Sequence, residues 1–326
     1  MKFSNLQPIF WRVAILIPAL GLFLAPIPAQ ALEIKDTNVE IRDDFVLEPA
    51  KQDIVLDPGE KTTKSLSIVN RTDREQTFTI QVEDFTGSRD LNQVVVLLGN
   101  DKGPYSLRDL IKPEVKSFRL KPRQRAIMDV NIAIPLDAEP GGKFASVLVS
   151  SEPVNDELAP GESRARTISR LGALYLVRVS GKVNEDASLK GFRLTDDKTF
   201  YEKGPFNFEL LFENNSSVHL VPQGRIEVKN ILGKKVADLE VVPFFSLPAS
   251  LRAAQITWDS SFAFGRYTAT ATIDRGYKEN ADVTDTLKVS FWVLPWKIVV
   301  GFLVVIILVA WILRKLVRSF EIKRKK

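Results

Sequence analysis

The sequence of 326 residues contains no cysteine and a single histidine. The lack of cysteine excludes disulfides, thiolate catalysis, zinc–thiolate sites and iron–sulfur clusters. One histidine excludes multi-histidine metal sites, and a histidine-based catalytic triad would depend on His219 alone. There is also no phosphate-binding glycine loop and no metal-ligand spacing. These absences favour a protein that is not an enzyme and that uses no cofactor or metal.

The net charge of +5 is distributed unevenly along the chain. Residues 1–31 contain two cations and no acid, and residues 292–326 contain eight cations and one acid. The remaining 260 residues hold 35 basic and 39 acidic side chains. A nucleic-acid binder concentrates positive charge on a folded domain. Because the excess here lies at the two ends, it indicates a membrane protein and no nucleic-acid partner.

Residues 1–31 predict a secretory signal peptide. Arg12 precedes the apolar run Val13–Leu24, and Ala29 and Ala31 form the small-x-small pattern of a cleavage site. The alternative is an uncleaved anchor, but twelve apolar residues reach about 18 Å as a helix, short of the ~30 Å hydrocarbon core. We therefore expect cleavage after Ala31. Export without cysteine favours a bacterial origin, because eukaryotic surface proteins of this size usually carry disulfides.

Residues 292–317 predict a transmembrane helix, followed by a basic cytoplasmic tail over 318–326. Residues 298–313 carry no charge, and the basic residues that follow place the tail in the cytoplasm. The predicted anchoring residues are Trp292, Trp296, Lys297, Trp311, Arg314, Lys315 and Arg318. A buried core helix is the alternative, but it would not end in a cluster of cations. The sequence thus predicts a single-pass type I protein of the cytoplasmic membrane, with residues 32–291 outside the cytoplasm.

Period-two alternation dominates the ectodomain. Examples are the apolar positions of 78–82, 128–134, 206–212, 267–273 and 287–291. Many short strands between turn residues predict an all-β ectodomain of two antiparallel β-sandwiches. We place the first domain at 32–185 and the second, membrane-proximal domain at 186–291. The two halves repeat a strand that ends in an asparagine-rich turn, at Asn70 and at Asn214.

One short helix is predicted in the ectodomain, one or two turns at 106–111. Ser106 is its expected N-cap, and Pro113 lies beyond its end. The polar segment 151–169 contains two prolines and a glycine, and it predicts a mobile loop between two core strands.

Several of these stretches resemble a known family. Residues 45–60, 67–70 and 135–145 are similar to bacterial cell-surface proteins described as WxL-interacting. Residues 214–230 and 264–267 resemble the membrane-proximal domain of that family, and the chaperone-like sandwiches of pilus assembly are looser relatives. The resemblance covers most of 45–317. It implies immunoglobulin-like domains, the first of which binds peptidoglycan, but the matched positions are structural and transfer no binding residue.

Other candidate sites have plainer alternatives. His219 lies in a predicted turn or strand edge, which is a more common role than that of a general base. The acidic pairs 43–44, 185–186 and 196–197 could serve glycan hydrolysis or bind calcium, the latter at 184–186 between the domains. The aromatic residues Phe244, Phe245, Trp258, Phe262 and Phe264 could form a sugar-stacking platform, whereas core packing is their default role.

Two classes of function follow from the sequence. The first is a membrane-anchored binding or scaffolding protein that contacts cell-wall polymer, namely peptidoglycan, or other surface proteins. Its expected contact surfaces are the sheet edges of the first domain and the loop 151–169. The second is an anchored cell-wall hydrolase or a short-tailed surface sensor. The basic tail leaves no room for a signalling domain, which weakens the sensor version.

Overall fold

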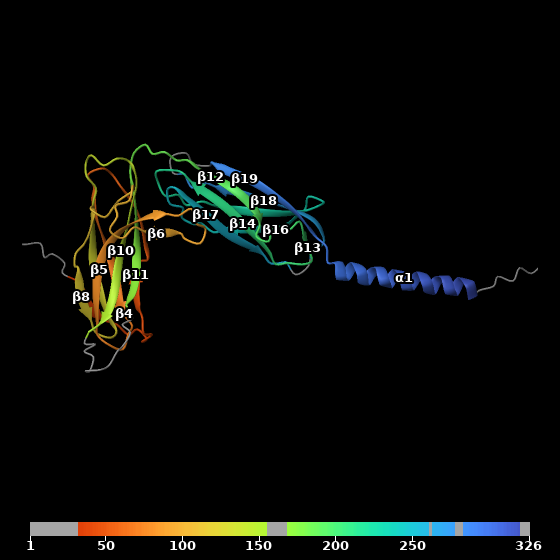
Figure 1. Cartoon of the computed structure of the whole chain (residues 1–326), viewed down its shortest axis with the longest axis horizontal. Helices are drawn as coiled ribbons and strands as arrows, with labels where there is room; N and C mark the ends of the chain where they lie inside the picture. Colours follow the sequence, from red (N-terminus) through yellow and green to blue (C-terminus); the bar gives the residue numbers. More distant parts are fainter. Residues whose placement is uncertain (1–31, 155–167, 261–262, 278–282, 320–326) are drawn as a thin grey trace, which may run out of the picture. The chain divides into compact units, whose positions relative to one another are not determined.

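The computed structural model describes residues 32–154, 168–260, 263–277 and 283–319. In this part of the chain, the strands form two groups (Figure 1). One helix, α1 (Trp296–Ser319), follows the last strand. The predicted signal peptide, with Ala29 and Ala31, lies outside the described residues. The structure therefore confirms a mostly β protein with one apolar C-terminal helix.

Residues 33–179 form two sheets that face each other across one core. The first sheet has the order β1 (Glu33–Asp36), β9 (Gln124–Ala133), β4 (Lys61–Asn70) and β2 (Phe45–Glu48), and β7 (Ile111–Pro113) also pairs with β9. The second sheet has the order β3 (Lys51–Leu56), β11 (Ser169–Val179), β10 (Gly141–Pro153), β5 (Gln76–Gly87) and β6 (Val95–Leu97), and β8 (Ser117–Leu120) also pairs with β5. We call these two sheets the first sandwich.

Residues 187–293 form a second pair of sheets, here called the second sandwich. Its smaller sheet has the order β12 (Ala187–Leu194), β14 (Phe206–Asn214) and β17 (Ser250–Trp258). Its larger sheet has the order β13 (Phe200–Tyr201), β19 (Thr284–Val293), β18 (Gly265–Asp274), β15 (Gln223–Asn230) and β16 (Lys235–Val241).

The alternation in the sequence produces the two cores. In β9, every second side chain from Ala126 to Ile132 is buried, and in β18 the same holds from Tyr267 to Ile273. Successive side chains of a strand point to opposite faces, so this pattern buries one face of each sheet. The buried residues of the two sandwiches form separate clusters. That of the second is rich in aromatic rings, with Phe206 5.0 Å from Trp258 and 5.2 Å from Phe291 between ring centroids.

Two strand pairs depart from the predicted antiparallel arrangement. β3 pairs in parallel with β11, and β13 pairs in parallel with β19. The chain leaves β2 in one sheet and enters β3 in the facing sheet after only Pro49 and Ala50. Because β3 enters the facing sheet instead of pairing with β2 in a hairpin, it is free to run parallel to its new neighbour, β11.

The helix predicted at 106–111 is a single turn. The N–H groups of Leu110 and Ile111 donate to the carbonyl of Leu107, and the chain then continues into β7. The predicted cap is also wrong, because the buried Ser106 hydroxyl has no hydrogen-bond partner. The carboxylate of Asp84 in β5 caps the turn instead, and its Oδ1 accepts the N–H groups of Leu107 and Arg108 at 3.2 and 3.1 Å.

The connection between the sandwiches runs from the end of β11 at Val179 to the start of β12 at Ala187, which includes the predicted boundary. In the described part of the chain, no strand of one sandwich pairs with a strand of the other. The contacts between them are local: Arg89 lies 2.6 Å from Glu213, and the N–H of Gly142 donates to the carbonyl of Ser217 at 2.8 Å. A small apolar cluster of Phe85, Phe144, Leu176 and Leu247 accompanies these contacts. That each sandwich folds independently stays a prediction.

Candidate contact surfaces and membrane anchor

The C-terminal helix meets the requirements for a membrane span by length and composition. The candidate span runs from Val300 to Arg318, 19 residues, and none of it is buried against the rest of the protein. The 24 residues of α1 reach about 36 Å, enough to cross the ~30 Å hydrocarbon core. A soluble core helix would be mostly buried, which α1 is not.

The C-terminal helix begins later than the predicted span, which starts at Trp292. Trp292 is the penultimate residue of β19, where it pairs with Arg266, and only Leu294 and Pro295 separate β19 from α1. The strand takes Trp292 because Phe291 and Val293 on either side of it are buried in the core. Trp292 is nevertheless 40% exposed, so its side chain is available at the predicted interface.

The other predicted anchoring residues lie in α1. The Lys297 ammonium lies 5.7 Å from the centroid of the Trp296 ring, and the Lys315 ammonium lies 5.3 Å from that of Trp311. At the other end, Arg314, Lys315 and Arg318 are exposed and still helical. Lys297 also lies 3.0 Å from Glu202 of the second sandwich. The hydrogen bond from Lys297 lowers the pKa of Glu202, which keeps this carboxylate charged beside the start of the helix.

His219 has a structural position. Its side chain is 1% exposed, Nε2 lies 3.1 Å from Asp53 Oδ1 in β3, and the Phe144 ring packs edge-on against the imidazole. The packing around the imidazole closes it off from solvent. The expected structural role is thus supported, although the contact to Asp53 across the two sandwiches was beyond sequence reasoning.

In each of the three acidic pairs, one carboxylate lies beside a cation. Both oxygens of Asp44 accept hydrogen bonds from the Arg71 guanidinium, at 2.7 and 2.5 Å. Glu185 and Arg178 form an almost fully buried ion pair at 3.0 Å. Asp196 lies 3.6 Å from Lys198. Among the described residues, no three or more His, Asp or Glu side chains lie close enough together to hold a metal ion. Calcium binding at 184–186 stays an untested hypothesis.

The aromatic candidates do not form one platform. Trp258 is buried in the core of the second sandwich, and Phe244 packs edge-on against Phe212. Phe245 lies beneath the Lys51 ammonium, 5.2 Å from its ring centroid. Phe264 is 57% exposed, and Phe262 lies outside the described residues. Core packing accounts for most of the set.

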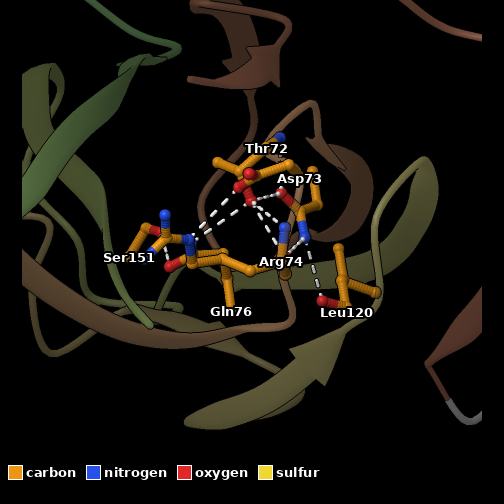
Figure 2. Close-up of polar contacts among 7 residues, drawn as sticks. Thr72, Asp73, Arg74, Gln76, Leu120 and Ser151 are labelled. Atoms are coloured by element: carbon orange, nitrogen blue, oxygen red, sulfur yellow. Dashed lines mark hydrogen bonds and ion pairs between the residues drawn. The ribbon is translucent and has the colours of Figure 1, made fainter. Parts of the chain in front are cut away.

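The predicted loop between two core strands is confirmed at its base. β10 and β11 pair antiparallel up to Ser151 and Ser169, and residues 155–167 of the loop lie outside the described residues. Polar side chains fix this base (Figure 2). The Ser151 hydroxyl donates to Gln76 Oε1 at 3.0 Å, and Gln76 Nε2 donates to the Thr72 hydroxyl at 3.2 Å.

Asn70, at the end of β4, anchors the same network. Its Oδ1 accepts the N–H of Thr72 at 2.9 Å, and its Nδ2 donates to the carbonyls of Arg74 and Leu120 at 2.9 and 3.0 Å. Asn70 is fully buried, so each of these bonds replaces one to water. We refer to this arrangement as the asparagine corner. It ties the turn after β4 to the end of β8 and thereby supports the base of the loop.

The second sandwich contains an equivalent corner. Asn214 at the end of β14 is also fully buried, its Oδ1 accepts the N–H of Ser216 at 2.8 Å, and its Nδ2 donates to the carbonyls of Val218 and Ser246 at 3.1 and 2.8 Å. The local backbone groups bonded by Asn214 lie two and four residues after it, as do those bonded by Asn70. The weak repeat in the sequence therefore corresponds to a shared structural element.

The open edges of the first sandwich are short. β1 and β2 have four residues each and β3 has six, which limits the length of any strand that could pair with them. The longest edge strand in the described part of the chain is β17 of the second sandwich, with nine residues. β12 is also an edge strand, but side chains already bond two of its backbone N–H groups. Asp285 accepts the N–H of Leu189, and the Tyr277 hydroxyl accepts the N–H of Ala187. At one end of β17, the N–H of Leu251 already donates to the carbonyl of Ser88 at 3.0 Å. That a sheet edge of the first sandwich contacts a partner stays a prediction.

A hollow of about 520 Å³ lies on the larger sheet of the second sandwich. Its walls come from β15, β16 and the end of β18 and include Arg225, Asp238, Glu240 and Asp274. Lys235 donates a hydrogen bond to Asp238 and lowers the pKa of this carboxyl group. Asp238 is therefore a charged carboxylate paired with a neighbouring cation.

Comparisons with known proteins place the chain in no family. No protein-family model and no curated protein matches the sequence. Among solved structures, the class 5 fimbriae chaperone CfaA is 11% identical with a TM-score of 0.37, and it covers 75% of this chain and 98% of its own. The Escherichia coli chaperone DraB is 13% identical with a TM-score of 0.32, and covers 76% of this chain and 96% of its own. The Pseudomonas aeruginosa CupB2 chaperone is 10% identical with a TM-score of 0.33, and covers 76% and 100%. Such distant likeness says nothing about function.

Proposed function

We propose that this chain is a membrane-anchored, extracytoplasmic binding protein that acts by contact and not by catalysis. The observation that carries the proposal is the direct connection between the second sandwich and an exposed apolar helix of 24 residues. Two residues separate strand from helix, so the sandwich is held at the bilayer surface. The paired state of the candidate carboxylates Asp44, Glu185 and Asp196 supports a role without hydrolysis.

The proposed ligand is peptidoglycan or another surface protein, as the family resemblance implies. The contact surfaces we propose are the loop between β10 and β11 and the edge of β17. The loop has a rigid base, because Ser151 and Gln76 connect it to the asparagine corner. β17 offers the part of its edge from Ala253 to Trp258 to a partner strand, because the N–H of Leu251 already donates to the carbonyl of Ser88.

Purified cell wall tests the binding proposal. The full chain in detergent, mixed with wall material, is expected to sediment with it and to release no soluble sugar. Release of fragments would favour the hydrolase instead. Deletion of residues 155–167 is expected to weaken capture, while the temperature of unfolding changes little because Ser151 and Gln76 are retained. As a matched control, shortening the β15–β16 hairpin is expected to leave capture unchanged.

Membrane orientation is tested with intact protoplasts. Added protease is expected to digest the sandwiches and to spare an epitope placed after α1. Digestion of that epitope with protection of the sandwiches would reverse the proposed orientation.

A further inference from the structure

The end of the second sandwich from which α1 leaves also contains the β15–β16 hairpin. Asn230, the last residue of β15, pairs with Tyr267 of β18, which in turn pairs with Phe291 of β19. Adjacent strands lie about 4.8 Å apart, so the hairpin tip lies about 10 Å to the side of the end of β19. Residues 231–234 follow Asn230 directly and therefore lie level with the last residues before the helix.

The tether to the helix is too short to hold this end far from a membrane. Leu294 and Pro295 are the only residues between β19 and α1, and three residue steps span about 10 Å at most. If α1 crosses a bilayer, the strand ends of the larger sheet lie at the headgroup layer.

The hairpin tip presents two adjacent aliphatic side chains to solvent. Ile231 is 68% exposed and Leu232 is 86% exposed. Turn positions normally carry polar residues, since nothing there buries an apolar side chain. The tip has a defined conformation: Asn230 Oδ1 accepts the N–H groups of Leu232 and Lys234 at 3.1 and 3.0 Å, and Gly233 takes a positive φ of 74°. The turn thus holds both aliphatic side chains outward.

Further exposed apolar side chains lie at the same end. In the described part of the two sandwiches, eight large apolar side chains are more than half exposed, namely Val55, Leu136, Ile168, Phe200, Ile231, Leu232, Val242 and Phe264. Four of these eight side chains lie at the end of the second sandwich from which α1 leaves. Phe200 pairs with Trp292 in the sheet, and Phe264 immediately precedes Gly265, the partner of Val293. We refer to Phe200, Ile231, Leu232 and Phe264 as the apolar rim.

Cations outnumber acids around the apolar rim. The exposed cations are Lys198, Lys203, Lys234, Arg266 and Lys297, whereas Asp196 and Asp197 are exposed and Glu202 is half-buried. Electrostatic attraction to anionic lipid would therefore add to the apolar contact.

We propose that the apolar rim binds the bilayer that α1 spans, with Ile231 and Leu232 inserted among the lipid headgroups. The inference rests on the proposed membrane anchor and goes beyond it. A rim bound to lipid would fix the second sandwich against the bilayer surface, whereas the anchor alone would leave the sandwich free to move on its tether. The chemistry fits a lipid interface, where apolar side chains and amphipathic rings such as those of Trp292 and Trp296 are stable.

The absence of cysteine from the chain makes the test direct. The full chain carrying Leu232→Cys is labelled with an environment-sensitive fluorophore and placed in lipid nanodiscs that contain lipids brominated near the headgroup. Leu136→Cys in the first sandwich is the matched control, because Leu136 is equally exposed at 86%. Leu308→Cys lies near the middle of α1. It is measured in a second set of nanodiscs, whose lipids carry bromine at the ends of the acyl chains, and it reports whether the helix spans. We expect bromine to quench the label at 232 at least twofold more than the label at 136.

The possible outcomes distinguish the lipid contact of the apolar rim from the membrane anchor itself. Quenching at 308, with equal and weak quenching at 232 and 136, overturns the lipid contact of the rim and leaves the anchor intact. No quenching at 308 overturns the anchor and this inference with it. Shielding of the label at 232 in native membranes but not in nanodiscs would assign the rim to a protein partner and also overturn the inference. Ile231→Ser in the Leu232→Cys background is expected to reduce the quenching at 232, and no change would count against insertion.

Discussion

Single buried asparagines shape both sandwiches. Asn70 and Asn214 each satisfy backbone groups of a turn and of a distant strand end. The sequence indicates both turns, because asparagine at a strand end is a common turn signal. It does not indicate that Leu120 and Ser246 supply the distant carbonyls, since that depends on how the sheets pack.

Asn214→Ala is expected to destabilise the second sandwich by about 2–3 kcal/mol. The change removes the bonds to the N–H of Ser216 and the carbonyl of Val218, and one of the two bonds to the carbonyl of Ser246, which also accepts the N–H of Leu220. Residues 32–185 contain no tryptophan. The change in tryptophan emission during urea unfolding therefore comes chiefly from Trp258, which is buried in the second sandwich, whereas Trp292, Trp296 and Trp311 are exposed. The exposed neighbour Asn215 is the control, and Asn215→Ala is expected to cost about 0.5 kcal/mol or less. Equal losses for the two variants would contradict the role of Asn214.

Glu213 connects acid stability to a contact between the sandwiches. Hydrogen bonds from Arg89 and then Lys190 lower its pKa below the ordinary value of 4.5. A lowered pKa in the folded state stabilises the protein above about pH 4.5, and the stabilisation is lost as the pH falls through the lowered value.

The wild type is therefore expected to exceed Glu213→Gln in stability by about 1 kcal/mol at pH 7, with the difference disappearing near pH 2. Urea midpoints of the two proteins, measured across this pH range, check the expectation. A difference that is constant with pH would show that the charge of Glu213 is not the cause.

At the scale of elements, the strands and α1 were predictable. One buried face imposes period two on strands such as β9 and β18, and a lipid-facing helix must be apolar all round. The remaining features depend on contacts distant in sequence. Asp84 lies more than twenty residues from the turn that it caps, and the parallel pairing of β3 requires knowledge of the facing sheet.

Charge inside α1 is expected to prevent stable insertion. Ile306→Arg combined with Leu308→Arg adds about 5–7 kcal/mol to the cost of insertion at the helix centre. The double variant is expected to leave the membrane fraction on washing with alkaline carbonate, whereas Ile306→Leu is retained. Retention of the double variant would show that α1 is not the anchor.

At the scale of the whole molecule, the described strands pair only within their own sandwich. We therefore expect fragments 32–185 and 186–293 to fold separately, each with β-type circular dichroism and a cooperative urea transition. The fragment boundary falls in the connection between β11 and β12, where no strand is cut. If neither fragment folds without the other, the local contacts around Glu213 and Ser217 are essential to both cores.

The opposite placement of the entry to and exit from the second sandwich has a mechanical consequence. The chain enters at Ala187, paired with Asn214, and leaves at Val293, paired with Gly265 at the other end of the sheets. Tension applied to the chain on either side of the second sandwich, at Ala187 and at Val293, would therefore run parallel to the strands. Antiparallel hydrogen bonds lie perpendicular to the strands, so such tension loads all ten residue pairs of the β18–β19 ladder together in shear. The second sandwich would thus resist stretching through the whole ladder instead of unzipping one bond at a time.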